Sequence, residues 1–450
     1  MTAYKESGIK WLGKIPTHWE IKPLKYLGFL YSGLSGKKGK DFSKDKIQDF
    51  KPYIPFINIC KNHYLDNELL HYVKIEENET QNKVLKYDLF FMTSSETKEE
   101  IGKNAIYLGD EKELYLNSFC RGFRFTSNEI NPLFINYLLS SKTYRYYFSS
   151  SSNGDIRINL KKEIIENLLV LLPPLEEQEK IADFLDKKLE KIDYFIAKQT
   201  KFIELLKEKK QVLINQATTK GLNKSTELKD TYISHLGKIP THWEVVRLKN
   251  IAKFNRGLNI TKENLKDDGV YCISYGEIHS KYPFIVNPKN HKLKCVENEY
   301  LNTNINSMLY KGDFIFADTS EDIEGSGNFT LYDGEDEAFA GYHTIIVRVD
   351  KNIFYPKFLA YEFDSKTYRN KIQSLVSGVK VFSITQAILR ETEVWIPPLE
   401  EQEKIAKYLD DKCEKIDKAI NNITKQISLI QEYKTSLIDT TTKGMLKELK

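Results

Sequence analysis

Very few residues in this chain have the types and spacing that catalysis needs. A phosphate-binding loop requires G-x-x-x-x-G-K-[ST]. The segment GLSGKKGKDFS (33–43) departs from it, because Leu34 stands where the first glycine is needed and Asp41 replaces the final hydroxyl residue. The loop of DNA amino-methyltransferases reads Asn-Pro-Pro-aromatic, and neither NPLF (131–134) nor its counterpart YPKF (355–358) contains both prolines. Both segments are instead typical of a helix start.

Metal and cofactor patterns are also missing from the sequence. The eight histidines show neither H-x-x-x-H nor H-E-x-x-H spacing, and no G-x-G-x-x-G follows a predicted strand. No C-x-x-C pair occurs among the five cysteines, which we expect to be reduced and partly buried. They are Cys60, Cys120, Cys272, Cys295 and Cys413. We therefore predict no catalytic residue and no metal ligand in this chain.

The chain instead repeats three long motifs at one spacing. LGKIPTHWE occupies 12–20 and 236–244, SKTYR occupies 141–145 and 365–369, and PPLEEQEKIA occupies 173–182 and 397–406. The two copies of each motif are 224 residues apart, and TTKG recurs at a distance of 223. Chance does not place three long matches at one distance, so the sequence indicates an internal duplication. His18 and His242 lie in the first motif, beside a tryptophan, where packing is a more ordinary role than catalysis.

Between these motifs lie two variable blocks, about 21–172 and 245–396, which share framework positions such as Gly33/Gly257 and Gly154/Gly378. Each block has short runs rich in aromatic and β-branched residues that predict strands. In the first block these are YIPFINI, YDLFFM, NAIYLG and GFRF, and in the second GDFIFA, GNFTLY and HTIIVRV. One amphipathic helix is predicted over 131–148 and another over 355–372, so each block is mixed α/β.

Each block is followed by a double proline and then by apolar residues that recur every seven positions. This heptad pattern over about five repeats predicts a coiled-coil helix in each half. The seam residues are Leu185, Leu189, Ile192, Ile196, Ile203, Leu206, Leu213, Leu409, Ile416, Ile420, Ile423, Ile427, Ile430 and Leu437. We expect the two helices to pair antiparallel, because a parallel pair needs a connection that returns along the whole length. Gln199 interrupts the first seam, either to fix the register or at a wet edge.

The predicted organisation is therefore two mixed α/β domains separated by two long helices that form an antiparallel coiled coil. The predicted ranges are 1–172 and 236–396 for the domains, 173–217 and 397–440 for the helices, 218–235 for the connecting loop and 441–450 for the tail. The N-terminus resembles no signal peptide, and no apolar run is long enough to span a membrane. We expect a cytoplasmic protein that does not bind membranes. The net charge of +4 is too small to identify a nucleic-acid partner on its own.

The combination of YKESGIKWLGKIPTHWE (4–20), the repeated PPLEEQEKIA, the heptads and TTKG resembles the specificity subunit of type I restriction–modification systems. The resemblance covers essentially the whole chain. It implies two target recognition domains that each read one half of a bipartite site in double-stranded DNA, with the coiled coil setting the spacing. It also implies a non-catalytic chain that docks two modification (methyltransferase) subunits, which two restriction (motor–nuclease) subunits then join. S-adenosylmethionine, ATP and Mg²⁺ would belong to those partners and not to this chain.

Base contacts do not follow from any family motif, so the candidate DNA-binding residues rest on residue type alone. Reading base edges favours Arg, Lys and Asn, while lysines also hold phosphates. The candidates are Lys37, Lys38, Lys40, Lys61, Asn62, Arg121, Asn153 and Arg157 in the first block and Arg256, Lys262, Lys281 and Lys380 in the second. The residues around Gly154 and Gly378 are favoured, because a glycine-marked loop recurs there with different polar neighbours. Two other hypotheses remain open: an adaptor that joins two protein ligands, and a self-contained DNA-modifying enzyme.

Overall fold

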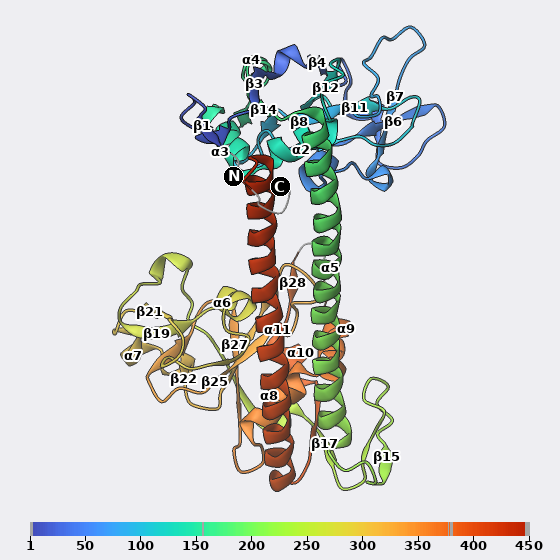
Figure 1. The fold of residues 1–450 in the computed structure, drawn as a ribbon. Coiled ribbons are helices and arrows are strands. Elements are labelled where there is room, and N and C mark those ends of the chain that lie inside the picture. Colours follow the sequence, from blue (N-terminus) through green and yellow to red (C-terminus); the bar gives the residue numbers. More distant parts are fainter. Residues whose placement is uncertain (1–2, 155–156, 377, 379–380, 446–450) are drawn as a thin grey trace. The chain divides into compact units, whose positions relative to one another are not determined.

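A computed structural model describes residues 3–154, 157–376, 378 and 381–445 of the chain. It divides into two compact units, unit 1 (Met1–Gln199 with Thr424–Lys450) and unit 2 (Thr200–Ile423). Both long helices, α5 (Leu175–Lys220) and α11 (Leu399–Thr442), contribute one part to each unit (Figure 1). The predicted domain ranges assigned each helix a range of its own, whereas the compact units divide the chain within the helices. Each variable block packs against a part of α5 and a part of α11.

Unit 1 contains two four-stranded sheets. The first is antiparallel with the order β10-β8-β12-β4, formed by Asn104–Ile106, Leu89–Met92, Cys120–Phe125 and Gly28–Ser32. The second has the order β11-β6-β7-β5, formed by Tyr115–Leu116, Phe50–Ile54, His71–Lys74 and Phe42–Ser43, with β11 and β6 parallel. Three short pairs complete the unit: β1 (Tyr4–Glu6) with β2 (Lys14–Pro16), β3 (Glu20–Pro23) with β14 (Leu169–Leu172), and β9 (Ser94–Ser95) with β13 (Ile158–Asn159).

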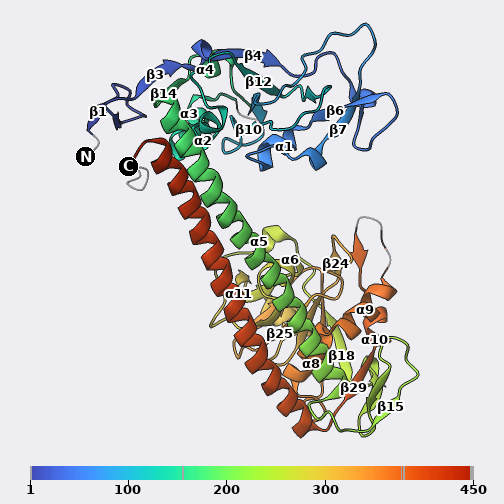
Figure 2. The same ribbon diagram turned by 45° about the vertical axis from the view of Figure 1, so that its right-hand side comes forward.

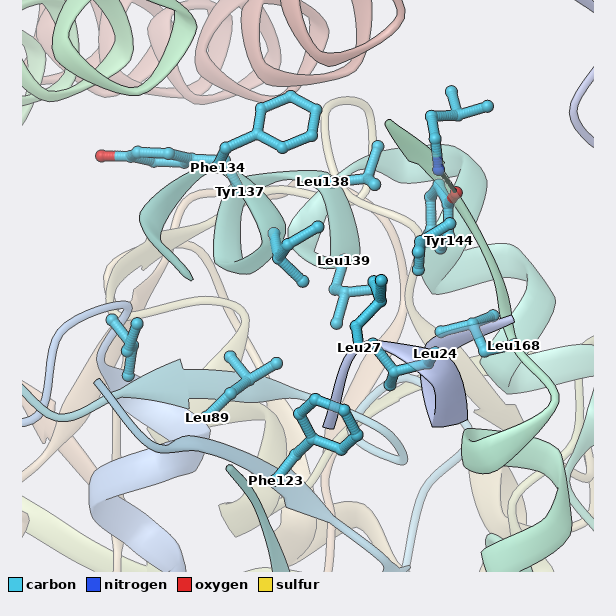
Figure 3. Packing of buried hydrophobic residues seen from close by; sticks show 14 of the residues in the cluster. Leu24, Leu27, Leu89, Phe123, Phe134, Tyr137, Leu138, Leu139, Tyr144 and Leu168 are labelled. Carbon is cyan, nitrogen blue, oxygen red and sulfur yellow. Dashed lines mark hydrogen bonds between the residues drawn. The ribbon is translucent and has the colours of Figure 1, made fainter. Parts of the chain in front are cut away.

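The core of unit 1 lies between the first sheet and helix α2 (Pro132–Ser140). Leu138 and Leu139 of α2 are fully buried together with Leu89 and Phe123 of the sheet (Figure 3). Asn131 caps α2, because its side chain accepts hydrogen bonds from two backbone N–H groups of the first turn. The NPLF segment is thus a helix start, as its sequence indicates.

Two details of the first block differ from the sequence prediction. The single helix expected over 131–148 is two helices, α2 and α3 (Lys142–Ser151), because Ser141 adopts an extended conformation that turns Tyr144 into the core. The strand expected at YIPFINI ends at Ile54, and Phe56–Lys61 forms helix α1. Pro55 precedes this helix, and the amide of buried Asn58 donates to the carbonyl of Asp66 over 2.8 Å. Short helix α4 (Lys162–Glu166) follows β13.

Unit 2 repeats this plan with its own elements (Figure 2). Its larger sheet has the order β18-β27-β23-β25-β20, formed by Ala252–Arg256, Thr344–Val349, Phe314–Ala317, Phe329–Tyr332 and Phe284–Val286. The smaller has the order β21-β19-β26-β22, formed by Lys294–Val296, Val270–Ile273, Ala338–Ala340 and Met308–Leu309. The short pairs are β15 (Leu228–Asp230) with β16 (Lys238–Pro240), β17 (Glu244–Arg247) with β29 (Glu393–Ile396), and β24 (Thr319–Ser320) with β28 (Phe382–Ser383). Its block helices are α6 (Tyr275–Ser280), α7 (Tyr300–Thr303), α8 (Pro356–Asp364), α9 (Lys366–Leu375) and α10 (Gln386–Arg390).

The strand register shows that the duplication extends to the fold. Ser32 of β4 lies opposite Arg121 of β12, and the residues 224 positions later, Arg256 of β18 and Ile345 of β27, also lie opposite each other. The helix expected over 355–372 is likewise divided, at Ser365. The internal repeat and the mixed α/β class are therefore confirmed.

The long helices run antiparallel, as predicted. In unit 1 the ammonium of Lys434 lies 2.6 Å from the carboxylate of Asp193, and in unit 2 that of Lys210 lies 2.7 Å from Asp417. A step toward the C-terminus on α5 thus matches an equal step toward the N-terminus on α11. Each of the fourteen predicted seam side chains is buried or half-buried. Within the described ranges, no helix combines the length and the apolar character that crossing a bilayer requires.

Candidate nucleic-acid interface

The repeated motifs meet in each unit and form a structural joint. In unit 1, Nε2 of His18 lies 2.8 Å from a carboxylate oxygen of Glu177, and the indole N–H of Trp19 donates to the same oxygen over 3.2 Å. In unit 2, His242 and Trp243 make the same contacts to Glu401, again at 2.8 and 3.2 Å. Both tryptophans are fully buried. The first motif therefore binds the start of a long helix in each half.

A buried glutamine next to each of these glutamates ties the helix to the variable block. The amide of Gln178 accepts from the backbone N–H of Asn131 over 2.9 Å and donates to the carbonyl of Pro173. The amide of Gln402 makes the corresponding bonds to Tyr355 and to the carbonyl of Pro397. Both blocks thus rest on the same hydrogen-bonded base, and differences between them are confined to what lies beyond it.

The glycine-marked loops close in the same way in both blocks. A Cβ atom on Gly154 would lie 2.1 Å from the carbonyl oxygen of Arg157, and one on Gly378 would lie 2.1 Å from that of Val381. Gly154 also has φ +133°, a conformation that side-chain-bearing residues rarely adopt. Each loop leads into a strand that pairs with the segment after β8 or β23, namely β13 on β9 and β28 on β24. Lys380, a predicted contact residue, lies outside the described residues.

At the first loop, the side chains of Asn153 and Arg157 are exposed. The guanidinium of Arg157 lies over the ring of Phe119, with 4.9 Å between the guanidinium carbon and the ring centroid. Phe119 is itself 44% exposed. Arg121, two residues further along the chain, is half-buried and donates weakly to the hydroxyl of Ser32 over 3.4 Å.

Two predicted contact residues of the first block already have partners within the protein. Lys37 forms an ion pair with Glu79, and only 9% of its side chain is exposed. Asn62 ends helix α1 and donates to the side chain of Asn58 over 2.9 Å. Lys38, Lys40 and Lys61, by contrast, are exposed and have no ion-pair partner in the part of the chain that the structure describes.

The predicted residues of the second block are all on its surface where they are described. Arg256 is exposed at the end of β18, and Lys262 lies in the short 3₁₀ turn Lys262–Asn264. Lys281 follows α6, at the C-cap position that Asn62 occupies after α1. The matching cross-strand pairs are Ser32 with Arg121 in unit 1 and Arg256 with Ile345 in unit 2. The arginine therefore lies on β12 in unit 1 and on β18 in unit 2. Each block thus carries one arginine there, on opposite strands.

The remaining arginines of the first block belong to its framework. Arg124 binds both carboxylate oxygens of buried Asp88, at 2.9 and 2.7 Å. Arg145 donates to the carbonyls of Glu99 and Ile101, and burial lowers the pKa of its guanidinium to about 10. Neither can leave these contacts without exposing buried polar groups.

Sequence reasoning missed the position that Phe119 shares with His343, 224 residues later. His343 is exposed, has φ +55° and lies 3.2 Å from the carboxylate of Asp318. The ring of Tyr275 is 5.3 Å from it. Aligning the two halves at the duplication distance would have placed Phe119 opposite the unlike His343. The alignment could not show that both side chains are exposed, because exposure depends on the fold. Among the described residues, no group of His, Cys, Asp and Glu side chains is arranged to hold a metal.

Comparisons with known proteins agree with this arrangement. The family described as "Type I restriction modification DNA specificity domain" matches residues 16–204 and 240–429. The chain is 26% identical to the type I restriction enzyme MjaVIII specificity subunit of Methanocaldococcus jannaschii, over 99% of this chain and 98% of that protein. It is 25% identical to the type I restriction enzyme EcoKI specificity subunit of Escherichia coli, over 92% and 87%.

Solved structures show the same fold. A chain from work on complex assembly and conformational transition of the type I R-M system aligns with a TM-score of 0.71 and 15% identity, covering 96% of this chain and 99% of that chain. The HsdS subunit from Thermoanaerobacter tengcongensis aligns with a TM-score of 0.51 and 14% identity, covering 96% and 98%.

Proposed function

Because this chain belongs to the family of type I restriction–modification DNA specificity subunits, we propose that it selects the DNA target of such a system. Each variable block contacts one half of a bipartite site, and the two halves differ in sequence. The chain performs no chemistry itself. The modification and restriction subunits that assemble with this chain bind S-adenosylmethionine, ATP and Mg²⁺.

One observation carries this proposal. The same joint supports both blocks, while the exposed residues around the glycine loops, here called the tips, differ between them. Glu177 and Gln178 make the same contacts as Glu401 and Gln402, while the residues around the glycine loops differ in charge and shape. A protein that binds two copies of one ligand would keep its tips alike. Two unlike tips on one scaffold suit a ligand with two unlike parts, as an asymmetric DNA site has.

The long helices also carry exposed apolar side chains that suit a protein partner. In unit 1 these include Tyr194 on α5 with Leu429 and Tyr433 on α11, each more than half exposed. In unit 2, Phe202 and Leu205 on α5 are about half exposed. Aromatic and aliphatic side chains of this kind are enriched where proteins bind each other. We assign these faces to two modification subunits, with two restriction subunits joining the complex.

The test is to express the chain with its modification subunits and to map methylated adenines and protected bases on DNA. We expect one bipartite site with two unlike halves and a fixed gap. The chain alone, incubated with labelled S-adenosylmethionine and DNA, should transfer no methyl group. Protection of no discrete site would contradict the proposal and favour a protein adaptor, and methyl transfer by the chain alone would identify an enzyme.

A further inference from the structure

Phe119 and His343 occupy one position in the two blocks and have unlike chemistry. Each lies just before an inner strand of a sheet, β12 or β27, and close to the segment that pairs with the strand after the glycine loop. The backbone N–H of Thr93 donates to the carbonyl of Phe119 over 3.1 Å, and that of Asp318 donates to His343 over 3.0 Å. The backbone at this position is thus held in the same way while its side chain changes.

In the first block, this position holds an arginine in place. The backbone N–H of Phe119 donates to the side chain of Asn117 over 2.9 Å. The hydroxyl of Thr93 donates to the backbone carbonyl of Phe119 over 3.0 Å. The carbonyl of Arg157 accepts from the side chain of Asn159 over 3.2 Å. The backbone carbonyls of both residues of this cation–π pair therefore accept hydrogen bonds from neighbouring side chains.

The side chain of Arg157 is exposed, and it forms no ion pair with any residue that the structure describes. Of the four arginines in this block, Arg124 and Arg145 are committed to the fold, and Arg121 is half-buried beside Ser32. The Arg157 guanidinium lies over the ring of Phe119, and its N–H groups donate no hydrogen bond to a described residue.

The hydrogen-bond donors of a guanidinium match the acceptors of one base, guanine. Guanine offers two acceptors, O6 and N7, in the major groove, and a planar guanidinium binds both at once. We propose that Arg157, positioned by Phe119, recognises a guanine in the half-site read by the first block; this inference rests on the proposed function. Phe119 is a positioning residue, because it acts by orienting the arginine.

Among its described residues, the second block carries no such pair at this position. His343 lies beside Asp318 and is surrounded by the rings of Tyr275 and Tyr342. A histidine with a carboxylate presents different donors and acceptors from an arginine on a phenyl ring. His343→Ala is therefore a matched control, because it alters the equivalent position and should affect only the other half-site.

The experiment uses the full chain with its modification subunits and the target mapped for the wild type. Duplexes carry 7-deazaguanine, which lacks N7, at one guanine of the first half-site at a time. For one of these guanines, wild-type binding should weaken about 10-fold or more. Arg157→Ala should bind the unmodified duplex about as weakly, and the 7-deaza change should then have no further effect.

Further variants separate base reading from other roles. Arg157→Lys keeps the charge but lacks the two parallel N–H donors of a guanidinium. It should therefore lose discrimination at this guanine while keeping non-specific binding. Phe119→Leu should lose part of the discrimination, and Phe119→Tyr should restore it. If Arg157→Ala binds the unmodified duplex like the wild type, or if it keeps its sensitivity to every 7-deazaguanine, the inference is wrong although the wild type still reads its site. If the wild type reads no site, the proposed function itself fails.

Discussion

At the scale of single residues, one buried carboxylate distinguishes the two blocks. Glu362 on α8 is fully buried, one of its oxygens accepts from the backbone N–H of Trp395 over 2.9 Å, and the other has no partner among the described residues. Burial raises the pKa of Glu362 well above its usual value. In the first block, Leu138 stands at this place, and the hydroxyl of Tyr144 satisfies the corresponding N–H of Leu171.

Glu362→Gln should make unit 2 more stable at high pH. A carboxyl whose folded pKa is raised contributes its stability below the unfolded value and loses it as the pH rises toward the folded pKa. Wild type should therefore lose stability relative to the variant by up to about 1.4 kcal/mol per pH unit above about pH 4.5. Urea unfolding at pH 5.5, 7 and 8.5 measures this difference. Leu138→Gln, the matched control, should destabilise at every pH, and parallel pH profiles for wild type and Glu362→Gln would contradict the prediction.

A second residue-scale difference concerns backbone strain. Tyr87 has φ +68°, whereas Gly312 with φ +93° stands at the matching place in the second block. Each is followed by an aspartate that binds an arginine with both oxygens, Asp88 with Arg124 and Asp313 with Arg348. A tyrosine in this conformation costs about 1–2 kcal/mol.

Tyr87→Gly should therefore raise the stability of unit 1. The relieved strain exceeds the entropy that glycine adds to the unfolded chain, about 0.4–1 kcal/mol, so the net gain is roughly 0.5–1 kcal/mol. Thermal unfolding should show a midpoint higher by about 1–4 °C. The reciprocal variant Gly312→Ala should lower the midpoint, because the backbone there has φ +93°, which residues with a side chain rarely adopt. A lower midpoint for Tyr87→Gly would refute the strain argument.

At the scale of elements, the long helices hold each block from two sides. In unit 1 the hydroxyl of Tyr137 donates to Asp186 on α5, while the hydroxyl of Thr143 donates to Asp439 on α11 over 3.0 Å. In unit 2 the roles of the helices are exchanged, since Tyr361 donates to Asp410 on α11 over 2.7 Å and Thr367 to Asn215 on α5 over 2.8 Å. Each block is therefore fixed to the coiled coil through side chains that recur at the duplication distance.

Deleting one heptad from each helix should shorten the gap in the DNA target. Removing residues 197–203 of α5 together with 424–430 of α11 preserves the register of both lysine–aspartate pairs. Their joint removal keeps the seam in phase and shortens each helix by about 10 Å, or about three base pairs at 3.4 Å each. Methylation mapping reports the gap. Deleting 197–203 alone, the control, should abolish assembly, and an unchanged gap in an assembled double deletion would exclude the coiled coil as the spacer.

At the scale of the whole molecule, the repeated joints predict that the two blocks are interchangeable. The backbone N–H and hydroxyl of Thr143 donate to Asp439, and those of Thr367 donate to Asn215, so either acceptor serves either block. Gln178 and Gln402 accept in the same way from the backbone N–H of the N-cap residue before α2 or α8. A block moved from one half to the other should find its supporting contacts.

Replacing residues 245–396 by a copy of 21–172 should therefore convert the target into two copies of one half-site. Each half should then be the sequence that the first block reads in the wild type, which methylation mapping would reveal directly. The reciprocal chain, with two copies of the second block, serves as the control and should read the other half twice. A retained asymmetric target would show that the blocks are not independent readers.

The sequence by itself determined the duplication, the mixed α/β blocks and the two long heptad helices, because repeats and heptads are patterns along the chain. It favoured antiparallel pairing of these helices, and only the contacts between them decided it. It also indicated the glycine loops, since a glycine at matching places marks a backbone that excludes a side chain. Only the tertiary structure decided which polar groups are available. Lys37 meets Glu79, Arg145 is buried against backbone carbonyls, and Arg157 lies on Phe119. These contacts join residues 38 to 46 positions apart in the sequence, and only folding brings them together.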